Sequence, residues 1–164
     1  MVRMKKIFFA LSLLVLVAGC KDEEVVLSDA EQLEKDIAII DKWLTDNSIT
    51  ALTDPSGLRY VITTAGTGVK PVLTNTIVAK YVGKFLADGV KPDKSVEFDS
   101  SKPTLTFKLS GLIPGWQIGF QLLPKGSKAT LYIPSGLAYG KNGAGSAIPP
   151  NSNMFFDVEL IDVK

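Results

Sequence analysis

Apolar residues recur with two different periods along this chain of 164 residues, and the first period is that of a helix. Between residues 28 and 47 they return after every three or four positions, which places them on one helical face. These positions are Leu33, Ile37, Ile40 and Leu44, with Ile39 and Trp43 beside them. Ser28 and Glu31 have the spacing of a capping box, and Asn47 is a suitable stop. The pattern predicts a helix over residues 28–47.

The apolar face of this helix has two candidate partners, its own domain and a second copy of the chain. One short stripe is too little to specify a coiled coil, so packing on the same chain is favoured. A monomer, or a weak dimer through helix 28–47, is therefore expected. Residues 48–55 lack the pattern and are predicted to be a linker. The helix and linker are assigned to residues 28–54, and the main domain to residues 55–164.

From Ser56 onward the period changes to two, which is typical of strands with one buried face. The alternating segments are Leu58, Tyr60 and Ile62; Ile77, Ala79 and Tyr81; Leu105, Phe107 and Leu109; Ala129, Leu131 and Ile133; and Met154, Phe156, Val158 and Leu160. Residues 113–122 break this alternation, because Pro114 suits a first helical turn and Trp116 and Phe120 lie one turn apart. The pattern predicts an α+β domain in which a curved, five-stranded antiparallel sheet wraps around one short helix.

The first twenty residues have a third pattern, a basic start followed by a run from Ile7 to Ala18 that is apolar except for Ser12. A run of 12 residues is too short for a membrane span and suits a signal peptide. Its end, Val17–Cys20, resembles a bacterial lipobox. We expect residues 1–19 to be the signal peptide, and Cys20 to be the lipid-bearing first residue of a tether over residues 20–27. An ordinary secretory signal with an incidental cysteine is the alternative.

Composition excludes several chemistries. The chain has no histidine, which excludes Ser-His-Asp and Cys-His nucleophiles and histidine-ligated zinc. Its single cysteine forms no internal disulfide or thiolate cage. A formal net charge of +1 gives no basic field for nucleic acid. No metal, no cofactor and no nucleic-acid partner are expected.

Four motifs along residues 55–164 together resemble the FKBP-type peptidyl-prolyl cis-trans isomerases. They are Phe98–Ser101, Ile113–Trp116, Leu137–Gly140, and Ile148–Ser152 leading into Phe156–Leu160. The motifs follow the family's order and spacing, and members of the bacterial envelope that carry signal peptides are the most similar. The resemblance implies a half-barrel of five or six antiparallel strands around a short helix, in agreement with the periodicity.

The resemblance also implies a prolyl pocket at the positions that match the family's motifs. These are Tyr81, Phe98, Asp99, Ile113, Trp116, Tyr139 and Phe156. Trp116 would form the floor between aromatic walls, and the Tyr139 hydroxyl and the Ile113 amide would donate to substrate carbonyls. Asp99 would shape the electrostatics rather than act as a base. The rim would be completed by Leu105, Leu112 and Ile148. Without the motifs, Trp116 would be interpreted as core and Asp99 as a turn cap.

The chain departs from better-known members in three places that bear on substrate preference and on drug affinity. Leu105 stands where many members have a wall-forming aromatic residue. The connection Val90–Glu97, which contains Pro92, is enlarged, and the loop Lys141–Ala147 is small, flexible and without an aromatic residue. A macrolide of the tacrolimus type is nevertheless a candidate ligand.

These inferences predict a lipid-anchored prolyl isomerase that faces the periplasm or lies on the outer membrane surface. Its partners would be unfolded or exported polypeptides that contain proline. Rotation about an X-Pro bond breaks no covalent bond, so a chain without histidine can catalyse it. Two alternatives remain: a non-catalytic peptide-binding module or holdase, and an accessory subunit that binds an envelope machine through helix 28–47.

Overall fold

The computed structural model describes residues 27–86, 96–101 and 103–164. The predicted signal peptide, Cys20 and nearly all of the predicted tether lie outside these residues, as does most of the connection Val90–Glu97. Among the described residues, none of the helices is both long enough and apolar enough to cross a membrane.

The predicted N-terminal helix is confirmed as α1 (Asp29–Asp46), and both of its predicted ends are present. The backbone amide of Glu31 donates to the Ser28 hydroxyl over 3.3 Å, and the backbone amide of Ser28 donates to the Glu31 carboxylate over 2.9 Å. This reciprocal capping box satisfies two amides that the first turn leaves unpaired. Asn47 caps the other end, where its backbone amide donates to the last turn.

Within the described residues, the main domain forms an antiparallel sheet of seven strands, whereas five or six were expected. The strands are β1 (Leu52–Thr53), β2 (Arg59–Thr64), β3 (Thr76–Phe85), β4 (Glu97–Ser100), β5 (Leu105–Lys108), β6 (Lys128–Ile133) and β7 (Met154–Val163). Their order is β1-β2-β6-β7-β3-β4, and β5 also pairs with β3. All five alternating segments contribute strands. The additional ones are short: β4, and β1 inside the predicted linker.

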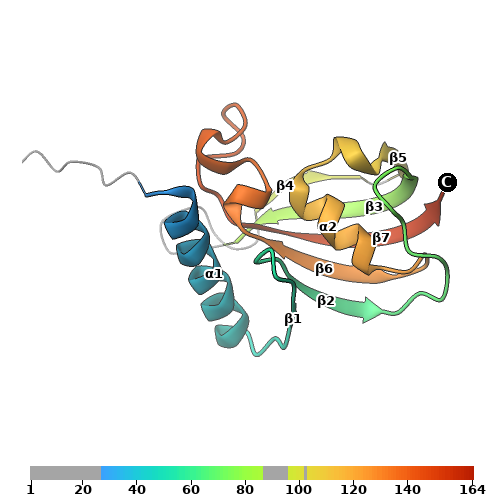
Figure 1. Cartoon of the computed structure of the whole chain (residues 1–164), viewed down its shortest axis with the longest axis horizontal. Helices are drawn as coiled ribbons and strands as arrows, with labels where there is room; N and C mark the ends of the chain where they lie inside the picture. Colours follow the sequence, from blue (N-terminus) through green and yellow to red (C-terminus); the bar gives the residue numbers. More distant parts are fainter. Residues whose placement is uncertain (1–26, 87–95, 102) are drawn as a thin grey trace, which may run out of the picture.

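The concave face of the sheet is covered by α2 (Pro114–Leu122), the predicted short helix (Figure 1). Pro114 occupies its first turn, where a missing amide costs nothing. Most of the predicted inward residues are buried here: Leu58, Ile77, Ala79, Ala129, Leu131, Ile133, Met154, Phe156, Val158 and Leu160. Leu105, at the start of β5, is 38% exposed, whereas Phe107 of the same strand is half-buried.

The convex face of the sheet is also partly buried, which corrects the expectation of one buried face. Ile40 and Leu44 of α1 form a second apolar cluster with Leu86, Tyr132 and Phe155. Tyr132 and Phe155 pair across β6 and β7, and the Trp43 ring lies 5.6 Å from each of their rings. The apolar stripe of α1 therefore packs on its own domain, as the favoured alternative predicted. Figure 1 shows α1 at one end of the sheet and the C-terminus at the other.

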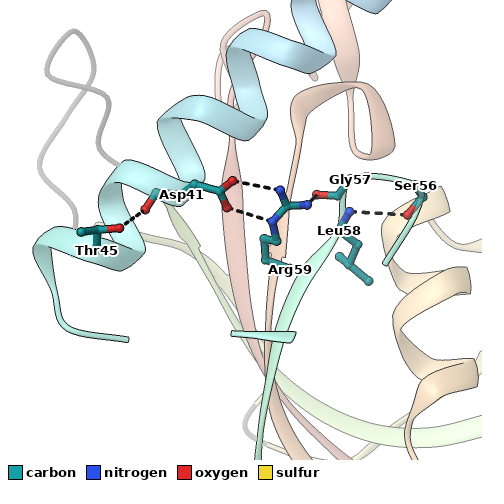
Figure 2. A network of polar contacts seen from close by, with 6 residues as sticks. All are labelled: Asp41, Thr45, Ser56, Gly57, Leu58 and Arg59. Atoms are coloured by element: carbon teal, nitrogen blue, oxygen red, sulfur yellow. Dashed lines mark hydrogen bonds and ion pairs between the residues drawn. The ribbon is translucent and has the colours of Figure 1, made fainter. Parts of the chain in front are cut away.

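Polar contacts fix α1 at two points along its length. Asp41 accepts two hydrogen bonds from the Arg59 guanidinium, over 2.8 and 2.9 Å, which ties α1 to β2 (Figure 2). Asp36 is only 1% exposed and accepts from the backbone amide and the hydroxyl of Ser135 over 2.9 and 2.6 Å. Ser135 begins the 3-10 turn η2 (Ser135–Leu137), so this second contact joins α1 to the connection between β6 and β7.

Candidate active site

Trp116 is the centre of an aromatic cluster between α2 and the concave face of the sheet. Its ring packs edge-on against three rings from the sheet, Tyr81 at 4.9 Å, Phe156 at 5.2 Å and Phe107 at 5.8 Å. Phe120, one helical turn away, lies at 5.3 Å. Edge-to-face packing at these separations is the favoured arrangement of aromatic pairs. We call Trp116, Tyr81, Phe107 and Phe156, together with Phe98, the concave aromatic cluster.

Phe98 joins this cluster from β4, a strand that the periodicity did not predict. Its ring lies 5.6 Å from the ring of Phe156 and 4.8 Å from that of Phe85. Gly83 makes this arrangement sterically possible, because it pairs with Phe156 on one side and Asp99 on the other. A Cβ atom at Gly83 would lie 2.6 Å from the ring of Phe156 and 2.9 Å from that of Phe98. A side chain at this position would therefore displace both rings.

The edge of the cluster is polar. The Tyr81 hydroxyl donates a hydrogen bond to the Asp99 carboxylate over 2.7 Å. Ser101, two residues after Asp99, holds the backbone of Tyr81 from both sides: its hydroxyl accepts from the Tyr81 amide, and its amide donates to the Tyr81 carbonyl, each over 3.0 Å. The carboxylate is exposed while Ser101 is buried. These hydrogen bonds fix the end of β4 against Tyr81 of β3, and the charge of Asp99 faces solvent.

Two tyrosines in this region keep their protons well above neutral pH. Partial burial, followed by the hydrogen bond to Asp99, raises the pKa of Tyr81 to about 12. Partial burial and the nearby negative charge of Asp99 also raise the pKa of Tyr139. Leu137 and Ala138, just before Tyr139, pack against the concave core and so place the Tyr139 backbone next to it. Tyr139 is 38% exposed, so its hydroxyl is available as a hydrogen-bond donor.

The beginning of α2 supplies a second available donor. Ile113 is the N-cap residue, and its carbonyl accepts from the amides of Trp116 and Gln117 over 2.9 and 3.1 Å. Its own amide has no acceptor among the described residues. Leu112, just before it, is held by a hydrogen bond from the Gln117 side chain to its carbonyl over 2.7 Å. The amide of Ile113 thus lies one helical turn from the Trp116 ring.

The three predicted rim residues differ in exposure. Leu105 is exposed and Leu112 is half-buried, whereas Ile148 is buried in the concave core. Ile148 pairs with Ala144 through two backbone hydrogen bonds, of 2.9 and 3.1 Å. Part of the loop Lys141–Ala147 is therefore tied by backbone hydrogen bonds to the residue that follows it.

Some residues of the site were not predicted from the sequence. Phe107 was assigned only to an inward face, yet its ring contacts Trp116 and Tyr81. The roles of Gly83 and Ser101 follow from strand pairing, which local patterns do not show.

Comparison with known proteins identifies the class. Residues 68–161 match the family of FKBP-type peptidyl-prolyl cis-trans isomerases. This match covers more than half of the chain, so the protein belongs to that family. Residues 4–20 match a prokaryotic membrane lipoprotein lipid attachment site. The protein is accordingly lipid-anchored in the cell envelope, as predicted.

Particular relatives come from bacteria. The chain is 49% identical over 109 residues to the FKBP-type isomerase FkpA of Aeromonas hydrophila, covering 66% of this chain and 39% of the relative. It is 43% identical over 110 residues to the outer membrane protein MIP of Legionella longbeachae, covering 67% and 46%. The chain thus spans less than half the length of these relatives.

Two crystal structures share the fold. A peptidyl-prolyl cis-trans isomerase from Pseudomonas syringae pv. tomato superimposes with a TM-score of 0.69 at 30% identity, covering 85% of this chain and 98% of that one. FkpA from Escherichia coli gives 0.67 at 38% identity, covering 82% and 64%. These matches confirm the expected fold class.

Proposed function

We propose that this protein catalyses cis-trans isomerisation of X-Pro bonds in exported polypeptides, at a site formed by the concave aromatic cluster and its polar edge. The observation that carries this proposal is an aromatic floor, Trp116, that lies one helical turn from the Ile113 amide, unpaired among the described residues, with the partly exposed Tyr139 hydroxyl as a second available donor. We further propose that Cys20 is the residue that carries the lipid, which would hold the site close to newly exported chains.

The aromatic rings account for the rate enhancement. Rotation about an X-Pro bond has a barrier of ~18–20 kcal/mol, because it removes the resonance of the amide. The twisted amide is less polar than the planar one, so an apolar surface stabilises the transition state more than the ground state. Trp116 would lie under the proline ring, and Tyr81, Phe98 and Phe156 would surround it. Because the cluster is apolar, an apolar residue before the proline is favoured.

The polar edge would hold the substrate backbone while the bond rotates. Tyr139 and the Ile113 amide would donate to the substrate carbonyls, and so keep the flanking chain in place. Asp99 would orient the Tyr81 ring through its hydrogen bond and give this edge a negative potential. A turn in the bound substrate would let one of its own amides donate to the prolyl nitrogen as that nitrogen becomes pyramidal. No step requires a group that accepts a proton from the substrate.

Exchange NMR with a Leu-Pro peptide tests the proposal. The protein is prepared without its signal peptide and with Cys20→Ser, so that it stays in solution. We expect cis-trans exchange to be far faster than the uncatalysed reaction, which takes tens to hundreds of seconds. Tyr139→Phe should reduce the catalysed rate about fivefold to tenfold, equivalent to ~1–1.4 kcal/mol. Binding of the peptide by the folded protein without any acceleration would contradict the proposal and favour a non-catalytic binding module.

A tacrolimus-type macrolide is the proposed competing ligand, because its apolar ring system suits the same floor. Leu105 offers such a ligand less contact area than an aromatic residue would. We expect Leu105→Trp to strengthen macrolide binding. The affinity of the wild type and the variant is measured by the change in tryptophan fluorescence, with isothermal titration as the check. An equal or weaker affinity would show that Leu105 does not contact the ligand.

A further inference from the structure

A groove with a volume of about 1020 Å³ lies between the first half of α1 and the connection that follows β6. One wall is formed by α1, through residues that include Gln32, Leu33 and Lys35. The other wall is formed by residues 135–142 and includes Gly136 and Tyr139. Its volume is at the upper end of the range for small-molecule pockets, so it has room for more than a compact ligand.

The two walls are held at a fixed separation by contacts that join them directly. The buried Asp36 carboxylate accepts from the backbone amide and hydroxyl of Ser135. Gln32 also donates to Asp36, over 2.7 Å, which fixes the carboxylate on the side of α1. At the exposed end, the side chains of Asp29 and Lys141 approach to 3.9 Å. The groove is therefore a feature of the docked helix.

The wall opposite α1 presents unpaired main-chain donors. The amides of Gly136 and Tyr139 have no acceptor among the described residues, whereas the amides of Leu137 and Ala138 are used within the turn. Unpaired backbone donors recognise the backbone of another chain without reading its side chains. Leu33 and Leu137 add apolar surface on the two walls. This combination suits an extended polypeptide of varied sequence.

The groove adjoins the candidate active site. Tyr139 lines the groove together with Leu137 and Ala138, and these last two residues also pack against the concave core that contains Trp116. We infer that the groove binds the stretch of substrate polypeptide that flanks the proline bound at Trp116. This inference rests on the proposed function and names its substrate class: extended, unfolded chains rather than short peptides. The X-Pro bond would be isomerised at the concave aromatic cluster while the neighbouring residues of the substrate occupy the groove.

Peptides of different lengths test the inference. A tetrapeptide with Leu-Pro is compared with peptides that carry about eight further residues, ~27 Å when extended, before or after this core. We expect one of the two extended peptides to have a kcat/KM about tenfold above that of the tetrapeptide, and a correspondingly lower Kd. Equal values for all three peptides would overturn the inference, because the groove would then add nothing.

Two variants narrow the groove from opposite walls. Gly136 lines the groove, and a side chain there would meet no atom within 4 Å at its Cβ, so Gly136→Trp adds a large side chain to this wall without a clash. Lys35→Trp does the same from α1. Both should bring the ratio between extended and short peptides close to one. The matched control is Glu34→Trp, since Glu34 is an exposed neighbour on α1 that does not line the groove. A ratio that survives both groove variants, or that falls equally in the control, would overturn the inference.

The ratio separates this inference from the proposed function. If no peptide is isomerised but the extended peptide still binds more tightly, and Gly136→Trp abolishes that gain, the groove is confirmed and catalysis is not. If all peptides are isomerised at the same rate and bind equally, catalysis is confirmed and the groove is not.

Discussion

The protein has two tryptophan-centred clusters, on opposite faces of the same sheet. On the concave face, Trp116 packs against Tyr81, Phe107 and Phe156. On the convex face, Trp43 packs against Tyr132 and Phe155. Because successive side chains of a strand point to opposite faces, the consecutive residues Phe155 and Phe156 belong to different clusters.

The two clusters resemble each other in their packing. Ring separations around Trp43 are 5.6 Å, within the range of 4.9 to 5.8 Å from Trp116 to its three rings on the sheet. Both indole N–H groups are buried without a hydrogen-bond partner in the described part of the chain, a cost of about 1–3 kcal/mol each. Neither aromatic packing nor an unpaired indole therefore distinguishes a functional site here.

The edges of the clusters differ. The convex cluster is closed by Ile40 and Leu44 of α1, which complete an apolar contact. The concave cluster ends instead at the Tyr81–Asp99 pair and at the partly exposed Tyr139. The candidate site is therefore defined by polar groups that reach solvent beside the rings. The rings alone would describe a core.

The largest difference in catalysis is expected between Phe156→Ala and Phe155→Ala. Each change should destabilise the fold by about 3–5 kcal/mol, because each removes a buried aromatic side chain. Catalysis per folded molecule, measured by exchange NMR, should fall at least tenfold in Phe156→Ala and stay near the wild-type value in Phe155→Ala. Urea denaturation provides the folded fraction of each protein.

Substitution by leucine gives a gentler version of the same pair, should alanine prevent folding. Phe156→Leu should still reduce catalysis more than Phe155→Leu does. Equal losses in both proteins would mean that the two clusters are equivalent parts of one core, and that the concave cluster has no separate role.

Sequence alone predicted α1 and the concave core because their signals are local. The capping residues Ser28 and Glu31 and the alternating strands each extend over a few positions. The convex face also had a local signal, since Leu131–Ile133 and Met154–Phe156 are continuous apolar runs, typical of strands buried on both faces. The burial of the convex face is therefore also visible in the sequence.

Other features of the site depend on contacts between distant parts of the chain. Asp36 and Ser135 are 99 residues apart, and neither has a neighbour that marks the contact. Phe107 and Trp116 meet only once the sheet has curved around α2. β4 was missed because Phe98 is the only large apolar residue in it, so its period could not be recognised. Tertiary packing determines each of these outcomes.

The second prediction concerns the contact that positions α1 over the convex cluster. Asp36→Ala should destabilise the protein by about 1–3 kcal/mol, because it leaves the buried Ser135 hydroxyl without its acceptor, while the Ser135 amide keeps a hydrogen bond to the Asn153 side chain over 3.0 Å. Asp36→Asn retains the volume and one acceptor, so its loss should be smaller. Urea denaturation measures both. If the alanine variant is as stable as the wild type, the convex cluster alone positions α1.

The third prediction uses pH to compare the tyrosines of the two clusters. Burial is the first cause that raises the pKa of both Tyr81 and Tyr132 to about 12; Asp99 then adds to the effect at Tyr81, and Asp157 at Tyr132. An unfolded tyrosine ionises near 10. The stability that these raised values contribute is therefore complete below pH 10 and is lost between about pH 10 and 12.

Ultraviolet absorbance of tyrosinate follows this titration. Asp99→Asn should lower the pKa of Tyr81 and leave that of Tyr132 in place, and Tyr81→Phe should remove the transition of Tyr81 while that of Tyr132 stays. A change of both tyrosines in Asp99→Asn would show that the carboxylate acts through the fold rather than through its own hydrogen bond.

The smallest expected effect concerns the ion pair between Asp41 and Arg59 in Figure 2. Arg59 is 12% exposed but Asp41 is 49% exposed, so solvent screens the pair, and Asp41→Asn should cost about 0.5–1 kcal/mol in urea denaturation. The more exposed pair of Lys42 and Asp46 is the control, with a cost of roughly 0.3–0.5 kcal/mol for Asp46→Asn. Catalysis should not change in either variant, because the aromatic contacts of the convex cluster hold α1 and the ion pair only orients it. A loss above about 2 kcal/mol in Asp41→Asn would contradict this expectation. It would mean that the ion pair, and not only the aromatic contacts of the convex cluster, holds α1 in place.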